Sequence, residues 1–472
     1  MAKNLENIMH QALILHQGQD LVRAAALYQS ILQQNPNHPG ANHFYGLLLS
    51  QQHDYEGALT YMTKALKTGT PSAAFWVNTG NVYEAQWQLE EAARCYRSAL
   101  QLNPNLDIAL LGAGIVAQKQ GEYDRAEKHY RAALAANPGL VQGHWNLAQL
   151  LLLTGRYDEG WTEYEWRLRG KSNWSRPTPT LETVRQAQRP VALVHEMGFG
   201  DLIHFIRFLP MLRERYPQLD LKCFCPPPLS RLLLDSLGRE TLLPDAELLS
   251  DRILPLPLMS VPHLLQLTPE QVSGQPYLRA GERAARNWRE RLAADAVPPE
   301  RLKVGLVWAG SPTHAHDRVR SVALRELAPL LEIPGVVFYS LQRGAGTEQL
   351  AELPEAVRPH DCGNQIENFA DLAGLMVNLD VVATVDTAAL HLAGALGVKT
   401  LALIQFSPDW RWELNGERTR WYDSVTLLRQ PRLADWSSCL TGLAARVREL
   451  AKTKKDHGTA MSRPENAGSI QP

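Results

Sequence analysis

The sequence predicts an all-α solenoid followed by two α/β domains, and three observations support this fold class. Pro138 follows Pro104 by 34 residues and Pro104 follows Pro36 by twice that interval, a period typical of stacked helix–turn–helix units. After about residue 190, apolar strand-like runs alternate with amphipathic runs, as in parallel sheets covered by helices. A chain of 472 residues is also too long for one hydrophobic core.

Other small and aromatic residues share the phase of the prolines. Small residues allow two helices to approach closely, and a ring fills the gap beside them. The clearest units contain Gly46, Ala58 and Ala65, then Trp76, Gly80, Tyr83, Ala92, Tyr96, Ala99 and Pro104, then Gly114, Ala126, Tyr130, Ala133 and Pro138. A weaker first unit contains Ala12, Ala24, Tyr28 and Pro36, and a fifth contains His144, Ala148 and Tyr164. This pattern resembles the tetratricopeptide repeat, so we assign residues 1–170 to such a solenoid.

A repeat solenoid usually presents a binding surface, so we expect the repeats to hold a protein partner or a protein acceptor. Asn78 and Asn146 occupy the same repeat position. These asparagines could bind the backbone of an extended peptide, or they could be ordinary polar residues on the surface of a helix. The second interpretation is favoured.

The composition excludes some classes of function. The 48 basic residues balance 49 acidic ones, which argues against general binding to nucleic acid or anionic membranes. The beginning of the chain lacks a signal-peptide pattern, and no run of 18 apolar residues predicts a membrane span. The five scattered cysteines favour reduced thiols and a cytoplasmic location.

The α/β part follows a Pro-rich and polar linker at 171–190. We expect a first α/β half at 191–280, with strands at 191–196, 219–225 and 252–257. The second half, at 281–452, has strand-like runs at 303–310, 335–342, 379–386 and 399–404 and helix-like runs at 324–331 and 387–397. The polar residues 453–472 predict a disordered tail. In such sheets ligands bind beyond the carboxyl ends of the strands.

The segment VDTAALHLAGALG, residues 385–397, is the first candidate site. Asp386 ends a strand, Thr387 begins a helix, and His391 lies one turn further on the same face. The free N–H groups at a helix N-terminus suit a phosphate. Two interpretations remain open: these residues bind a phosphate, or Asp386 or Thr387 caps the helix and His391 packs.

The segment HEMGFGD, residues 195–201, is the second candidate. Gly198 and Gly200 allow a tight strand-to-helix turn with close approach of a ligand. Asp201 at the start of the helix would repel a phosphate, so it is either a general base on a hydroxyl group or a helix cap.

The third candidate is the loop WAGSPTHAHDRVRS, residues 308–321. Arg318 and Arg320 follow a strand end, where a guanidinium group could neutralise a diphosphate. His314 and His316 lie in a polar loop without a carboxylate cluster, so we expect no metal site.

These segments together resemble the glycosyltransferase-B enzymes related to the bacterial ADP-heptose:lipopolysaccharide heptosyltransferases, over about residues 190–450. The resemblance implies two facing Rossmann-like domains, with Asp201 as the base that activates the acceptor hydroxyl. Donor contacts would come from Ser311, Asp386, Thr387 and His391. Ala388 stands where this family often has glycine, and the family's donor-side lysine has no obvious match, so Arg318 or Arg320 would substitute. The repeats joined to this fold class also give an architecture similar to that of protein O-linked N-acetylglucosamine transferase.

We therefore expect a metal-independent glycosyltransferase with a nucleotide sugar as donor substrate and no other cofactor. The first α/β half would bind the acceptor and the second the donor. The rival hypotheses are an inactive repeat scaffold that keeps a nucleotide-binding transferase fold, and a nucleotide-binding sensor. Asp201 favours the enzyme, because a binding protein needs no base.

Overall fold

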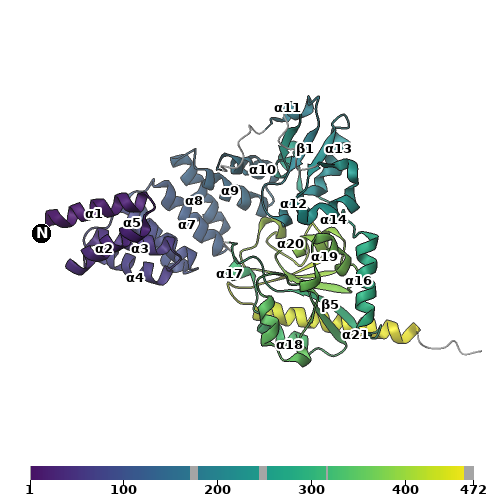
Figure 1. The fold of residues 1–472 in the computed structure, drawn as a ribbon. Helices are drawn as coiled ribbons and strands as arrows, with labels where there is room; N and C mark the ends of the chain where they lie inside the picture. The colour runs from purple at the N-terminus through teal and green to yellow at the C-terminus, as the bar shows by residue number, and fades with distance from the viewer. Residues whose placement is uncertain (1, 171–178, 244–251, 315–316, 462–472) are drawn as a thin grey trace, which may run out of the picture. The chain divides into compact units, whose positions relative to one another are not determined.

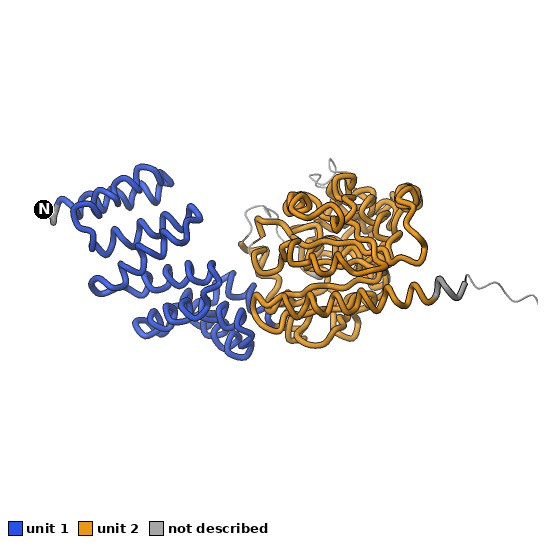
Figure 2. The backbone as a smooth tube through the Cα atoms, turned by 90° about the horizontal axis from the view of Figure 1, so that it is seen from below, with its two compact units in different colours: residues 1–150 blue, residues 151–472 orange. Residues whose placement is uncertain are grey.

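The computed structural model describes residues 2–170, 179–243, 252–314 and 317–461. Contacts divide the chain into two compact units, residues 1–150 and 151–472 (Figure 2). Among the described residues, none of the helices combines the length and the apolar character that crossing a bilayer would require.

The repeats are antiparallel helix pairs (Figure 1). The second helices of successive pairs begin 34 residues apart, and so do the first helices from the second pair onward. The pairs are α1 (Ala2–Gln17) with α2 (Leu21–Gln34), α3 (Pro39–Gln51) with α4 (Tyr55–Lys67), α5 (Ala73–Ala85) with α6 (Leu89–Leu102), α7 (Asp107–Lys119) with α8 (Tyr123–Ala136), and α9 (Val141–Leu153) with α10 (Tyr157–Tyr164). The weak first repeat is therefore a complete pair, and α9 spans the boundary between the units.

The glycines of the repeats are required for close approach of the two helices in a pair. A Cβ atom added at Gly80 would lie 2.9 Å from Cε1 of Tyr96, and one at Gly114 would lie 2.5 Å from Cε1 of Tyr130. Both rings are almost fully buried. The predicted packing of a small residue against a ring is confirmed.

The solenoid and the compact unit do not end at the same place. The sequence places the end of the solenoid at residue 170, whereas the first compact unit ends at Leu150. The reason is that α10 and the 3-10 helix η1 (Glu165–Gly170) pack within the second unit. Arg167 of η1 forms an ion pair with Glu196, 2.9 Å apart, directly after the first strand.

The second unit contains two sheets, and every strand pair in the described residues is parallel. The first sheet has the order β3-β2-β1-β4 and the second the order β10-β9-β8-β5-β6-β7. The strands are β1 (Val191–Val194), β2 (Leu221–Phe224), β3 (Leu242–Leu243), β4 (Leu254–Pro257), β5 (Leu302–Val307), β6 (Val336–Ser340), β7 (His360–Asp361), β8 (Val381–Val385), β9 (Thr400–Ile404) and β10 (Val425–Arg429). The expected alternation of strands and helices with parallel pairing is thus present.

Helices surround these sheets. They are α11 (Leu181–Arg185), α12 (Phe199–Phe205), α13 (Leu209–Arg215), α14 (Pro227–Leu237), α15 (Val261–Leu265), α16 (Glu282–Ala294), α17 (Asp317–Arg320), α18 (Ala328–Leu331), α19 (Phe369–Met376), α20 (Ala388–Ala395) and α21 (Ser437–Met461). The helix expected at 324–331 consists of the 3-10 helix η7 (Leu324–Leu327) followed by the single turn α18.

Two expectations about irregular segments need correction. The linker predicted at 171–190 contains the short helix α11, because Val184 is fully buried and anchors it; residues 171–178 lie outside the described residues. The tail predicted from 453 is helical up to Met461, since α21 continues from its buried part at Val447, and residues 462–472 lie outside the described part.

Candidate functional site

The loops that follow β1 and β8 contact each other through the first turns of α12 and α20. A Cβ atom added at Gly200 would lie 3.0 Å from Cδ2 of His391 and 3.4 Å from Cα of Ala388. Gly200 therefore lets two helices approach, whereas the sequence suggested close approach of a ligand. A Cβ atom at Gly198 would meet only Oδ2 of Asp201 at 3.5 Å, an ordinary contact distance.

Asp201 has two partners in the structure. Its Oδ2 accepts a hydrogen bond of 3.1 Å from the Gly198 N–H group, so it caps the first turn of α12. Its Oδ1 accepts one of 2.5 Å from Nη2 of Arg411. The alternative predicted role is that of the N-cap residue. Gly198 occupies that position, and Asp201 caps the helix from its third residue. An ionised carboxylate has about four lone-pair directions, so these two contacts leave room for a third partner.

Arg411 joins the two halves of this unit. Its Nη1 donates to Asp409 at 2.9 Å, and the guanidinium carbon lies 4.5 Å from the centre of the Trp410 ring. The two carboxylates raise the pKa of Arg411 well above its ordinary value in spite of burial. Its Nε atom is buried and has no hydrogen-bond partner among the described residues. A buried cation with one unused donor can accept a further anionic group.

Arg411 was not among the site residues predicted from the sequence, although it lies in the distinctive segment DWRWEL, residues 409–414. A charged residue between two tryptophans is the signal that was available, because isolated charges rarely stand in strongly apolar surroundings. Trp410 and Trp412 are both almost fully buried.

Asp386 directly follows β8, close to the position expected, and its charged neighbours are Asp409, Arg320 and Arg411. These four residues and Asp201 are called the charged cluster below. Burial raises its pKa to about 6, and the Asp409 carboxylate adds to this increase, while Arg320 and Arg411 act in the opposite direction. A carboxyl group whose pKa lies near neutral pH is typical of sites that bind or transfer protons.

Thr387 is the N-cap residue of α20, and its side chain does not cap the helix. Its Oγ1 atom is buried and has no hydrogen-bond partner among the described residues. Buried hydroxyl groups are normally satisfied. The unsatisfied hydroxyl and the first N–H groups of α20 are therefore the groups best placed to bind a ligand here.

His391 is held by packing contacts. Its Nδ1 lies 2.9 Å from the Tyr422 hydroxyl, which also lies 3.0 Å from Nδ1 of His204. The ring of Trp412 stacks on His391 with centroids 5.3 Å apart. Burial lowers the pKa of both histidines, so both are neutral at pH 7. The packing interpretation of His391 is the one that these contacts favour.

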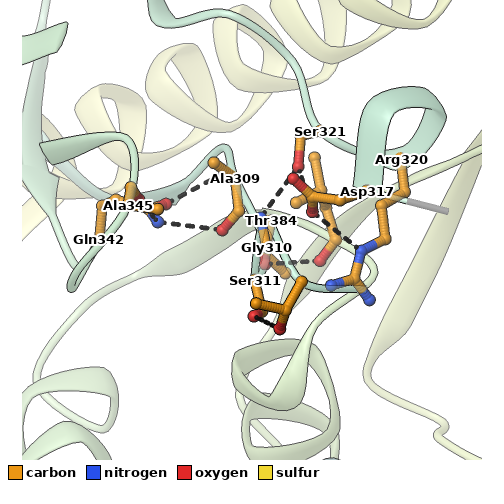
Figure 3. A network of polar contacts seen from close by, with 11 residues as sticks. Ala309, Gly310, Ser311, Asp317, Arg320, Ser321, Gln342, Ala345 and Thr384 are labelled. Carbon is orange, nitrogen blue, oxygen red and sulfur yellow. Dashed lines mark hydrogen bonds and ion pairs between the residues drawn. The ribbon is translucent and has the colours of Figure 1, made fainter. Parts of the chain in front are cut away.

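The loop after β5 is an ordered polar network (Figure 3). The Gln342 side chain accepts from the Ala309 N–H group at 3.0 Å and donates to the Ala309 carbonyl at 3.0 Å. The Gly310 N–H group donates to Ser321 at 2.9 Å, and Ser321 donates to Asp317 at 2.9 Å. This network fixes the backbone beyond the carboxyl end of β5.

The predicted donor residues of this loop are not equivalent. Arg320 is mostly buried and pairs with Asp317 at 3.3 Å, and it is close enough to lower the pKa of Asp386. Arg318 and Ser311 are exposed, and Ser311 bonds to Thr313 at 2.8 Å. Arg320 is therefore the basic residue that this loop brings to the charged cluster.

The repeat asparagines both have partners within the chain. Nδ2 of Asn78 lies 3.1 Å from Nε2 of His43, whose ring stacks on Phe75 with centroids 3.7 Å apart. Asn146 accepts a hydrogen bond of 2.9 Å from Gln142. The Asn146 contact is local and exposed, as the favoured interpretation expects, whereas Asn78 is half-buried and bonds to the buried His43 of the preceding repeat.

Comparison with known proteins identifies the helical repeats. Two models described as tetratricopeptide repeat match residues 73–106 and 111–165. Protein FlbA of Caulobacter vibrioides is 25% identical over 344 residues, which cover 64% of this chain and 54% of FlbA. The chain therefore spans about half the length of that relative.

Similar solved structures include other repeat proteins. MamA is 19% identical, with 38% of this chain and 98% of MamA covered and a TM-score of 0.33. TTC0263, a repeat protein of Thermus thermophilus, is 23% identical, with 35% and 90% covered and a TM-score of 0.31. From the family models and the helix pairs together, this chain carries tetratricopeptide repeats.

Proposed function

We propose that the α/β unit is a glycosyltransferase-like module of the two-domain type, which binds a nucleotide-sugar donor without a metal ion. The tetratricopeptide repeats would hold a protein partner or a protein acceptor. The observation that carries the proposal is the start of α20, where the Thr387 hydroxyl is buried without a partner among the described residues, next to free helix N–H groups.

In this proposal the donor diphosphate lies at the N-terminus of α20. The Thr387 hydroxyl and the helix N–H groups would donate to its oxygens. Arg411 offers its unused Nε donor, and Arg320 would exchange part of its pairing with Asp317 for the phosphate. Both guanidinium groups would stabilise the negative charge that develops on the leaving diphosphate.

The acceptor hydroxyl would approach from the side of α12. Asp201 would take its proton as the hydroxyl attacks the anomeric carbon, while the bond from that carbon to the diphosphate breaks. The proton would move to the carboxylate and the bonding electrons to the nucleoside diphosphate. Since Arg411 already pairs with Asp201, the diphosphate would have to draw Arg411 partly away for the carboxylate to act as a base.

The second candidate function is an inactive scaffold that keeps the fold. It is favoured by the pairing of both Asp201 oxygens, which gives this residue a structural role without catalysis.

Calorimetric titration with a panel of nucleotides and nucleotide sugars, in the presence of a chelator, tests the donor site. We expect one nucleoside diphosphate to bind and its affinity to fall about twofold to tenfold in Thr387→Val, the loss of one hydrogen bond. Binding that requires a divalent ion, or that is equal in the variant, would contradict the donor assignment. Release of nucleoside diphosphate in the presence of a protein acceptor then separates the enzyme from the scaffold.

A further inference from the structure

The first compact unit contains a cavity of about 240 Å³ between two neighbouring repeats, which we call the inter-repeat cavity. It lies between α6, α7 and α8. Its lining consists of Ala93, Arg97, Leu100, Gln101, Ala113, Val116, Ala117, Gln120, Arg125 and His129. Pockets that enclose drug-sized ligands measure roughly 300–1,000 Å³, so this one has the size for a single large side chain.

The 34-residue register explains why the cavity is present in this repeat. Ala117 occupies the repeat position that holds leucine or tyrosine elsewhere, namely Leu15, Leu49, Tyr83 and Leu151. Ala113 occupies a position that holds larger residues elsewhere, namely Gln11, Tyr45, Thr79 and Leu147. Two alanines on one face of α7 thus remove the side-chain volume that fills the other repeats. Interiors normally pack without such gaps.

The floor and the rim of the cavity differ in chemistry. Val116 and Ala117 form a buried apolar floor, whereas Arg97 and Arg125 are exposed at the rim. Among the described residues no hydrogen bond or ion pair involves the Arg97 guanidinium group. Arg125 pairs with Glu122 on the same helix, an exposed contact that contributes little. Burial and Arg125 both lower the pKa of His129, which is therefore neutral at pH 7.

We propose that the inter-repeat cavity binds a protein partner by taking up one large apolar side chain that lies beside an aspartate or glutamate in the partner. The apolar floor would desolvate the side chain, which is how anchor residues dominate many interfaces. Arg97 would form a charge-assisted hydrogen bond with the carboxylate. This inference deepens the proposed role of the repeats and is independent of the nucleotide site.

A protein segment fits this site better than a nucleic acid. Binding to nucleic acid needs a series of phosphate contacts. Here Glu90 in α6 and Glu122, directly before α8, lie close to the two arginines in the sequence and would repel phosphates. A phosphate backbone also has no group that would fill a single apolar cavity.

Selection from a phage-displayed library of random dodecapeptides on the immobilised full-length protein tests the proposal. We expect the enriched peptides to share an aromatic residue, leucine or methionine next to an aspartate or glutamate. A synthetic peptide of this kind should bind at least about tenfold more weakly to Ala117→Leu, because leucine is the size that other repeats carry at this position. Arg97→Gln should weaken binding by a similar factor.

The matched control is Arg94→Gln, which removes the same charge from an exposed position of α6 that does not line the cavity. Melting curves of all variants establish that they are folded. Because Arg97 is exposed, Arg97→Gln tests the site even if Ala117→Leu at the buried position is unstable. Enrichment of peptides without this pattern, failure to enrich any peptide, or equal binding by both variants would overturn the proposal.

Discussion

Replacement of Asp201 by asparagine distinguishes the structural and the catalytic roles of this residue. The carboxylate accepts from the Gly198 N–H group and from Arg411. Asparagine keeps one oxygen acceptor and places an NH₂ group where the other oxygen was. The asparagine oxygen can therefore accept from only one of the two donors, the Gly198 N–H group or Arg411. The NH₂ group then faces the other donor and cannot accept its hydrogen bond.

The loss of stability follows from the contact that is lost. A hydrogen bond to a charged group contributes about 1.5–3 kcal/mol. The Asp201 side chain is 25% exposed and Asp409 still pairs with Arg411, so solvent screening and the remaining partner reduce this figure. We expect the free energy of unfolding to fall by about 1–2 kcal/mol, as measured by urea titration of the full chain.

The effect on turnover depends on the role of the carboxylate. If Asp201 is the general base, asparagine cannot take the proton, and the rate should fall by about 10²–10⁴-fold with the donor affinity little changed. If Asp201 only positions Arg411, the rate falls because the guanidinium group moves.

Asp409→Asn is the matched control, since Asp409 pairs with the same guanidinium group at 2.9 Å and has a similar exposure of 29%. A base at Asp201 predicts a large loss in Asp201→Asn and a small one in Asp409→Asn, measured as release of nucleoside diphosphate with the acceptor present. Equal losses would assign the effect to Arg411. Near-normal turnover of Asp201→Asn would refute catalysis by this residue.

Three further predictions test the site and the repeats. Thr387→Val should leave the melting temperature unchanged, because the Thr387 hydroxyl has no partner among the described residues. The same variant should bind a nucleoside diphosphate more weakly in titrations. A clear loss of stability would show that the hydroxyl has a structural role. Burial raises the pKa of Asp386 from 3.8 to about 6, so the unfolded chain loses this proton first as the pH rises. The folded state therefore loses stability between about pH 4 and pH 6, and the full penalty is present above about pH 6. Asp386→Asn should therefore melt higher than the natural protein at pH 7, with a difference that shrinks towards pH 5; a constant difference would contradict this. Ala92→Leu should overpack the fully buried interface in its helix pair and lower the free energy of unfolding by about 1–3 kcal/mol; unchanged urea unfolding would contradict the packing.

The repeats could be predicted in detail because each repeat places the same residue in the same surroundings. Tyr28, Met62, Tyr96, Tyr130 and Tyr164 follow one another at 34 residues, and all are almost fully buried. A pattern that recurs in this way reports packing directly. Single positions carry less information, which is why the cavity beside Ala117 became apparent only in the structure.

The α/β unit could be predicted only in outline. Long apolar runs such as those of β5 and β8 are recognisable in isolation. The strands β3 and β7 have two residues each and therefore no periodicity, and their pairing depends on neighbours distant in the chain. For the same reason Asp201 was predicted without its partner. Arg411 lies 210 residues further along the sequence, and no local pattern could join the two.

The fifth repeat departs from the repeat pattern at one position. At one repeat position the chain has Ile31, Ala65, Ala99 and Ala133, but the fifth repeat has Arg167. The second helix of this repeat ends at Tyr164, and the 3-10 helix η1, which contains Arg167, follows it.

Arg167 then pairs with Glu196, and both side chains are almost completely buried. Removing one partner of such a buried pair usually destabilises a protein by about 3–5 kcal/mol. Glu196 lies in the loop that leads from β1 to Asp201, so the departure from the repeat pattern anchors this loop. Arg167, which departs from the repeat pattern, thus holds the loop that leads from β1 to Asp201.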